Sequence, residues 1–274
     1  MCVMAVLNVP GFEAITLLNE NTQGAVYRAK RLHDGLPVVL KQAYGKTAKG
    51  KLEHEFYVLN QLESPHIVRA YSFEDVSGSP LLVLQDVQGV PFAGLVNSGL
   101  VNSGLVSPVA EVLLEMALGA AFALATVHEA GFIHRDVTLA NLIWDSSEQH
   151  TTLLDFGIAI QTDCFTVEED DRLPGTLAYM APEQLGGQVD CRADLYSLGV
   201  CLYGLRTGQL PFTSEHPMAL IDAHKHHAPP PLTPRADLLE AFDEMILRLL
   251  AKHPDDRYSS SDELLTDLQH ITTT

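Results

Sequence analysis

Two polar motifs near the middle of the chain carry the residue types that phosphoryl transfer requires. His134-Arg135-Asp136 is followed by Asn141, and Asp155-Phe156-Gly157 comes after them. An apolar run adjoins each motif, and short apolar runs between turn residues are typical of buried strands. Phosphoryl transfer uses one carboxylate to orient the attacking hydroxyl, and a carboxylate and an amide oxygen to hold Mg²⁺. The order and spacing therefore predict that these polar groups converge on one site.

The chain around these motifs changes from strand-like to helical periodicity near residue 88. Runs separated by Asn, Gly and Asp predict strands before that point, together with one helix that ends at Ser64-Pro65. Longer helical patterns dominate the rest of the chain. Predicted strands cover 12–18, 25–30, 36–41, 67–73 and 81–87, and predicted helices cover 52–62, 108–130, 193–206, 236–252 and 261–271.

This order of elements predicts an α+β fold with two lobes. A small mostly-β lobe is expected over 12–87 and a larger mostly-α lobe over 88–271, with 1–11 as a tail or an edge strand. At the junction, Gly-Leu-Val-Asn-Ser occurs at 94–98 and again at 99–103, which indicates a tandem duplication in a surface segment.

The amino-acid composition limits which binding partners and which cellular compartment the protein is expected to have. The chain has 274 residues, of which 46% are hydrophobic, enough for a large buried core. The 35 acidic against 17 basic residues give a net charge of −18, which disfavours nucleic acid and anionic membranes, and no local basic stripe is found. The four cysteines show no metal spacing and suit a reducing compartment, and no segment predicts a membrane span. We therefore expect a cytoplasmic protein with neither nucleic acid nor membrane as partner.

The two motifs resemble those of the eukaryotic-type Ser/Thr protein kinase family, from about Phe12 to Ile271. Ala181-Pro182-Glu183 is similar to the end of the family's activation segment. Asp194–Val200 resembles the buried helix that anchors the catalytic loop, and the family pairs the residue at Arg257 with the glutamate of Ala-Pro-Glu. Gly175-Thr176 resembles the Ser/Thr-specific members.

The resemblance implies a bilobal protein kinase fold that transfers the γ-phosphate of MgATP to a protein hydroxyl, in signalling. Asp136 would orient the substrate hydroxyl and accept its proton, with Arg135 beside it, and Asn141 and Asp155 would hold Mg²⁺. Arg135 would take a partner from the activation segment. Candidates for that partner are Thr162, Thr166 and the acidic run 168–171.

In the small lobe, Lys41 is similar to the lysine that grips the α- and β-phosphates, and its partner would be a helix glutamate. Leu52, Glu55 and Leu59 share one helix face, and a carboxylate on an inward stripe is costly to bury unless it is paired. Glu55 is therefore the predicted partner of Lys41. The other nucleotide-binding positions that the resemblance implies are Asn19, Asn21, Gly24, Val26, Val39, Leu84 as the gatekeeper, Gln85 and Val87 in the hinge, and Ile143.

Two regions, the phosphate loop and the segment after Asp136, depart from the family pattern. The phosphate loop normally carries three glycines, but here Asn19 and Asn21 replace the first two and only Gly24 remains. Asn tolerates a left-handed backbone, so we expect the turn itself to survive. The family's lysine two residues after Asp136 is replaced by Thr138. The Thr138 side chain is shorter, and its neutral hydroxyl would offer the γ-phosphate a weaker hydrogen bond than a lysine.

Two alternatives stay open. A pseudokinase, an ATP-binding signalling module with little or no transfer activity, is favoured by the Asn residues of the loop and by Thr138. A small-molecule phosphotransferase of kinase-like fold is disfavoured by the Ala-Pro-Glu segment. The chain is also expected to belong to a longer signalling protein, and the histidines at 128, 150, 224, 226 and 227 are predicted to be solvated or capping residues.

Overall fold

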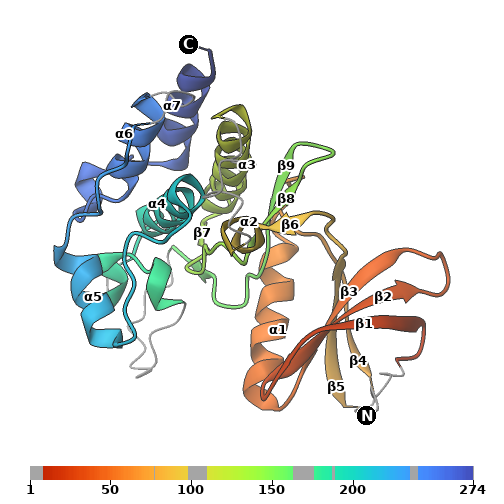
Figure 1. The fold of residues 1–274 in the computed structure, drawn as a ribbon. Helices are drawn as coiled ribbons and strands as arrows, with labels where there is room; N and C mark the ends of the chain where they lie inside the picture. Colours follow the sequence, from red (N-terminus) through yellow and green to blue (C-terminus); the bar gives the residue numbers. More distant parts are fainter. Residues whose placement is uncertain are drawn as a thin grey trace. The chain divides into compact units, whose positions relative to one another are not determined.

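The computed structural model describes residues 9–76, 78–97, 110–162, 176–186, 189–234 and 240–273, drawn as a ribbon in Figure 1. The chain forms two compact units, and each is described by itself. Unit 1 comprises residues 1–63 and 68–87, and unit 2 comprises residues 64–67 and 88–274.

Unit 1 is built on one antiparallel sheet with the strand order β1-β2-β3-β5-β4 (Figure 1). Alternate residues of β2 and β3 point to opposite faces, as the strand pleat requires. One face carries an apolar core that includes Ala25, Tyr27, Val38 and Leu40. The strands are β1 Phe12–Asn21, β2 Gly24–Arg31, β3 Pro37–Ala43, β4 Ala70–Val76 and β5 Ser79–Gln85.

The helix of unit 1, α1, spans Lys46–Leu59 and packs on β3, β4 and β5. It begins earlier than predicted, and it ends at Leu59 rather than at Ser64-Pro65. Its buried positions are Leu52, Glu55, Val58 and Leu59, so the predicted inward stripe is present.

The predicted strand 67–73 begins late, at Ala70. Ile67 instead bridges Leu153 of unit 2, and Leu153 N donates to His66 O over 2.8 Å. The predicted start of that strand was wrong because the backbone at residues 66–67 forms its hydrogen bonds with a strand far away in the sequence, which local sequence does not indicate.

Unit 2 is mostly helical. Its central helix, α4, is buried from Ala193 to Arg206, and Gly199 allows close approach to α6, since a Cβ there would lie 2.7 Å from Leu249 Cβ. The helix α3 packs on α7, β9 and α4 (Figure 1). The helices are α2 Phe92–Asn97, α3 Ala110–Glu129, α4 Arg192–Thr207, α5 Pro217–His226, α6 Glu240–Leu249 and α7 Ser261–Thr273.

Short strands and 3₁₀ turns complete unit 2. The sheet β6-β8-β9 and the pair β10-β7 flank the loop that carries the first polar motif. The prediction of an α+β chain with a smaller mostly-β part and a larger mostly-α part is confirmed. The strands are β6 Val90–Pro91, β7 Phe132–Ile133, β8 Leu142–Asp145, β9 His150–Leu153 and β10 Ile160–Gln161, and the 3₁₀ turns are Leu177–Tyr179, Pro182–Leu185 and Pro254–Asp256.

Two helices of unit 2 were not predicted. The helix α5 starts at Pro217, where proline suits the first helical position, and α2 contains the start of the first pentapeptide copy. The remaining repeat lies outside the described residues. The helix predicted over 236–252 is shorter, since α6 ends at Leu249.

By length and composition alone, α3 could cross a membrane, but 56% of its apolar window is buried inside the protein. A core helix of a soluble protein passes the same test, so this result carries little weight for a membrane span.

Candidate active site

The loop of residues 134–141, between β7 and β8 (the catalytic loop), is fastened by the buried side chain of His134. Its Nδ1 accepts a hydrogen bond from Asp136 N over 3.2 Å. Because Nδ1 accepts, the ring proton lies on Nε2, which donates to Leu154 O over 3.0 Å. The ring also packs edge-on against Phe156, with 4.6 Å between centroids. His134 therefore joins the catalytic loop to the segment after β9.

A buried carboxylate on α4 holds the backbone of the same loop. Oδ2 of Asp194 accepts from His134 N, and Oδ1 accepts from Arg135 N, each over 2.8 Å. His128 Nε2 lies 2.9 Å from Oδ2. Burial disfavours the charge on Asp194, but the bonds with His128 and His134 outweigh burial and hold the pKa of Asp194 below its ordinary value. These bonds support Arg135, whose φ of 67° is unusual for a non-glycine residue.

The carboxylate of Asp136 is oriented from two sides. Asn141 Nδ2 donates to Asp136 O over 2.9 Å and to Oδ2 over 3.0 Å. Thr176 donates to Oδ1 through its backbone N over 3.2 Å and its Oγ1 over 3.1 Å. Oδ1 accepts both bonds from Thr176, whereas Oδ2 accepts one bond and keeps a second lone pair, so Asp136 can still accept a hydrogen bond from a substrate hydroxyl through Oδ2.

Asn141 immediately precedes β8 and Asp155 follows β9, the strand that pairs with β8, and both side chains offer oxygen ligands. Both atoms that face the Asn141 amide nitrogen are acceptors, so the amide orientation is settled and Oδ1 is the atom left for a cation. Leu154 N donates to Asn141 O over 2.8 Å, which places the Asp155 segment beside the loop. Mg²⁺ prefers such oxygen donors, so this pair of residues fits a magnesium ion.

Thr138 lies inside the catalytic loop. Its side chain is 4% exposed, and its Oγ1 accepts from Asn141 N over 3.3 Å. Thr138 therefore helps to close the turn that presents Asn141. A contact of its hydroxyl with a phosphate stays a prediction.

Arg135 has unused hydrogen-bonding capacity in the part of the chain that the structure describes. Its Nε is buried without a partner there, and burial lowers the pKa of its guanidinium. The predicted partners Thr166 and 168–171 lie outside the described residues, as does Gly175. Thr162 instead donates to Gly131 O over 3.2 Å.

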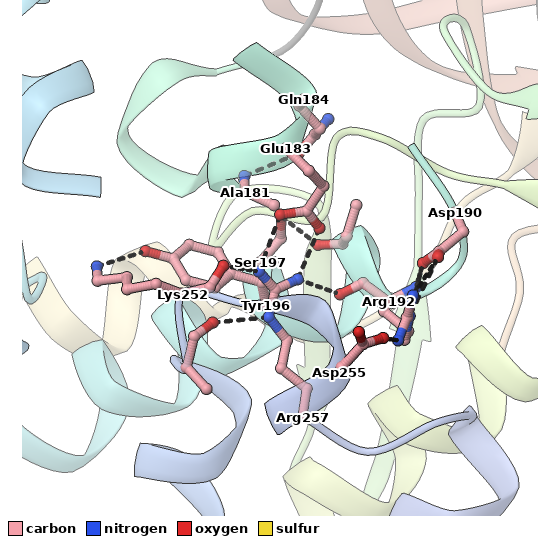
Figure 2. Close-up of polar contacts among 12 residues, drawn as sticks. Ala181, Glu183, Gln184, Asp190, Arg192, Tyr196, Ser197, Lys252, Asp255 and Arg257 are labelled. Carbon is pink, nitrogen blue, oxygen red and sulfur yellow. Dashed lines mark hydrogen bonds and ion pairs between the residues drawn. The ribbon is translucent and has the colours of Figure 1, made fainter. Parts of the chain in front are cut away.

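Arg257 and Glu183 form the ion pair that the resemblance implied (Figure 2). The two guanidinium nitrogens Nη1 and Nη2 lie 2.6 and 2.8 Å from the two Glu183 oxygens. The remaining donors of Arg257 bind the carbonyl oxygens of Arg192, Ala251 and Lys252. All five donors of a buried guanidinium are thereby satisfied, which ties the Ala-Pro-Glu segment to the start of α4 and to the residues after α6.

In unit 1, Lys41 on β3 pairs with Glu55 on α1, and the distance between Nζ and Oε1 is 2.7 Å. Their side chains are 20% and 4% exposed. The contact predicted from the helix stripe is therefore present, while the role of Lys41 at a phosphate stays a prediction.

The predicted nucleotide-contacting residues of unit 1 share one face of the sheet. Val26 pairs with Lys41, and Val39 pairs with Leu84. Cross-strand partners lie on the same face, which here is opposite the apolar core that includes Leu40. Of the other predicted positions, Gln85 ends β5, Val87 follows it, and Ile143 is buried in β8 of unit 2.

The turn between β1 and β2 is present, as expected, but neither Asn19 nor Asn21 adopts a left-handed backbone. Asn21 pairs with Gly24 across the turn between β1 and β2, and Asn19 lies in β1. Among the described non-glycine residues, positive φ values occur at Arg135, Gln149 and Asp155. Glycine is required at position 24 because the backbone of Gln42 lies close to it, and not because of its φ. A Cβ at this position would lie 2.1 Å from Gln42 O.

Comparison with known proteins assigns the chain to a family. The protein kinase domain matches residues 12–268. The chain belongs to the protein kinase family.

The kinase domain is similar in sequence to several bacterial serine/threonine-protein kinases. It is 33% identical over 260 residues to serine/threonine-protein kinase Pkn1 of Myxococcus xanthus, covering 91% of this chain and 36% of Pkn1. It is 35% identical over 219 residues to serine/threonine-protein kinase PknB of Mycolicibacterium smegmatis, covering 77% and 34%. A probable serine/threonine-protein kinase of Streptomyces coelicolor is 31% identical over 273 residues, covering 94% and 39%. The kinase domain thus spans little more than a third of the length of these relatives.

Two histidines of the kinase domain are structural, and their prediction as solvated or capping residues was wrong. His128 Nδ1 lies 2.7 Å from Ser261 Oγ, and its Nε2 binds Asp194. His224 is 1% exposed, and its Nδ1 lies 2.9 Å from Tyr196 Oη. The signal for His128 was its position four residues after Leu124 on the buried stripe of α3. The exposed side chains of His226 and His227 lie beside Asp222.

His150 is a third structural histidine. Its ring stacks on His66 with 4.3 Å between centroids, and its Nε2 lies 2.8 Å from Pro65 O. Sequence reasoning named Thr176 through its resemblance to the Ser/Thr-specific members but missed its contact with Asp136, which joins positions far apart in the chain.

Proposed function

We propose that this kinase domain transfers the γ-phosphate of ATP to a serine or threonine hydroxyl of a protein substrate. The observation that carries the proposal is the Asp136 carboxylate, held by Asn141 on one side and by Thr176 on the other. Such a group is preorganised to orient a hydroxyl and accept its proton. The names of the relatives, serine/threonine-protein kinases, support the same activity.

In this reaction the substrate oxygen forms a bond to the γ-phosphorus, and the bond from that phosphorus to the bridging oxygen of ADP breaks. Asp136 receives the hydroxyl proton. Lys41, held by Glu55, would bind the phosphates through its ammonium group. Asn141 and Asp155 would hold Mg²⁺, which supplies positive charge opposite the transferred phosphoryl group.

The wider setting also belongs to the proposal. The domain would act within a longer signalling protein, as the partial coverage of its relatives suggests. We propose that this protein acts in the cytoplasm. Two cysteines of the described residues, Cys191 and Cys201, are free thiols, which suits a reducing compartment.

Transfer of labelled γ-phosphate to a generic basic protein, with and without Mg²⁺, tests the activity. We expect Asp136→Asn to lower the rate by about 10²–10⁴-fold, the usual contribution of general-base catalysis. Asp145→Asn, at the end of β8, is the matched control and should retain the wild-type rate. Equal background from wild type and Asp136→Asn would instead establish the pseudokinase alternative.

A further inference from the structure

The turn between β1 and β2 is closed by its own side chain. Residues 21–24 (the hairpin tip) form a two-residue turn in which Asn21 pairs with Gly24. Asn21 Oδ1 accepts from Gln23 N over 2.8 Å and from Gly24 N over 3.1 Å. One carboxamide oxygen thus occupies two backbone donors at the tip, an arrangement typical of asparagine at the first position of a turn.

Further contacts hold the hairpin tip in this form. Tyr44 N donates to Gln23 O over 2.7 Å, and Tyr44 Oη lies 3.4 Å from Glu20 Oε1. The peptide between Gln23 and Gly24 is therefore bonded through its carbonyl to Tyr44 and through its N–H to Asn21. The tip is an ordered turn whose two outward backbone donors are already engaged.

Backbone N–H groups at such a turn are the donors that a kinase hairpin offers to phosphate oxygens. We infer that the Asn21 side chain competes with the nucleotide phosphates for these two backbone donors. Asn21 would therefore lower the affinity of the domain for ATP without changing its affinity for adenosine. This inference rests on the proposed function. Binding of a triphosphate at the tip requires Asn21 to release Gln23 N and Gly24 N, whereas binding of adenosine does not.

The expected size follows from the bonds that are exchanged. A neutral hydrogen bond on an exposed surface contributes little net free energy, and two such bonds correspond to about a 5-fold change in a dissociation constant. The effect should appear in the affinity for ATP and be absent from the affinity for adenosine.

The test compares dissociation constants of MgATP and adenosine, measured by titration calorimetry on the full chain. Asn21→Ala removes the competing oxygen without adding backbone freedom, and Asn21→Gly restores glycine at the second position of the motif. We expect both variants to bind MgATP about 5-fold more tightly and adenosine unchanged. Thr22→Ala, a truncation in the same turn whose side chain makes no described contact, is the matched control and should match wild type for both ligands.

The outcomes separate the inference from the function on which it rests. Unchanged or weaker MgATP binding by Asn21→Ala, with wild type binding both ligands, overturns the competition and leaves the kinase assignment intact. A parallel change for MgATP and adenosine also overturns it, because the effect would then come from the fold of the hairpin. Absence of MgATP binding by wild type and all variants would instead refute the proposed function.

Discussion

The catalytic loop of unit 2 and the hairpin tip of unit 1 are both predicted to meet the nucleotide, but they are held in different ways. In the catalytic loop, backbone N–H groups of His134 and Arg135 donate to the buried carboxylate of Asp194. In the hairpin tip, backbone N–H groups donate to the exposed amide oxygen of Asn21. A buried, charge-assisted bond is about twice as strong as a neutral one and is not exchanged with water.

The difference follows the agreement of each region with the family pattern. In the catalytic loop, where His134, Arg135, Asp136 and Asn141 keep the family pattern, the backbone is fixed by Asp194 on another element. Where glycines are replaced, a neighbouring side chain takes the backbone donors that a ligand would use. The backbone donors of the catalytic loop are thus bound by a buried residue of another helix, while those of the hairpin tip are bound by one exposed local side chain.

The largest effect is expected from Asp194→Asn, which leaves at least one buried N–H of the catalytic loop without its acceptor. Each such loss costs about 1–3 kcal/mol, and we expect the free energy of unfolding to fall by about 3 kcal/mol, together with the transfer rate. Denaturant unfolding and a transfer assay measure the two quantities. Asp243→Asn, which breaks the Arg206 pair elsewhere in unit 2, should lose stability but keep the rate. A wild-type rate for Asp194→Asn would show that the loop does not need this anchor.

In unit 1, Lys41→Met should lower the transfer rate by about 100-fold or more, as expected for a single electrostatic group. It also removes the cation that offsets the burial of Glu55, so stability should drop. The double variant Lys41→Met/Glu55→Gln should recover stability but not the rate. Lys49→Met, at an exposed position of α1, controls for the substitution itself. Near-normal turnover by Lys41→Met would disprove the phosphate role.

His224 predicts a pH dependence confined to unit 2. Burial, with a contribution from Lys252, lowers its pKa to about 4. The unfolded chain gains this proton near pH 6.5 and the folded chain only near pH 4, so stability is full above pH 6.5 and falls as the pH drops toward 4.

His224→Gln should reduce this loss by about 2 kcal/mol at pH 4.5, measured by unfolding across pH. His226→Gln, an exposed position on the same helix, should retain the wild-type profile. Identical acid profiles for His224→Gln and wild type would contradict the assignment.

The smallest effect is expected at Thr138. Thr138→Lys should place a cation near the γ-phosphate but removes the Oγ1 acceptor of Asn141 N, which keeps its bond to the Thr138 backbone O over 3.1 Å, so the rate should rise by less than about 10-fold. Thr138→Val, which loses the acceptor alone, should slow transfer several-fold and raise the Mg²⁺ requirement, whereas Thr138→Ser should resemble wild type. Equal rates for the Val and Ser variants would show that the hydroxyl does not position Asn141.

Sequence reasoning reached those contacts whose partners are close in the chain or lie on a regular stripe. Asp136 and Asn141 share one loop, and the burial of Glu55 followed from its place on the helix face. Contacts such as Thr176 with Asp136, or His128 with Ser261, join segments whose separation carries no periodic signal. The acidic run 168–171 lies outside the described residues, so its pairing with Arg135 stays a prediction.

By itself, the sequence determined the family, the order of the main strands and helices except α2 and α5, and the residue types at the predicted site, because periodicity and motif spacing are local properties of the chain. Only the tertiary structure decided that Ile67 pairs with Leu153 within unit 2, that Thr138 closes a turn, and that Asn21 occupies two backbone donors. The physical reason is that each polar group must find a hydrogen-bond partner, and which of several partners it takes depends on the backbone that folding brings within reach.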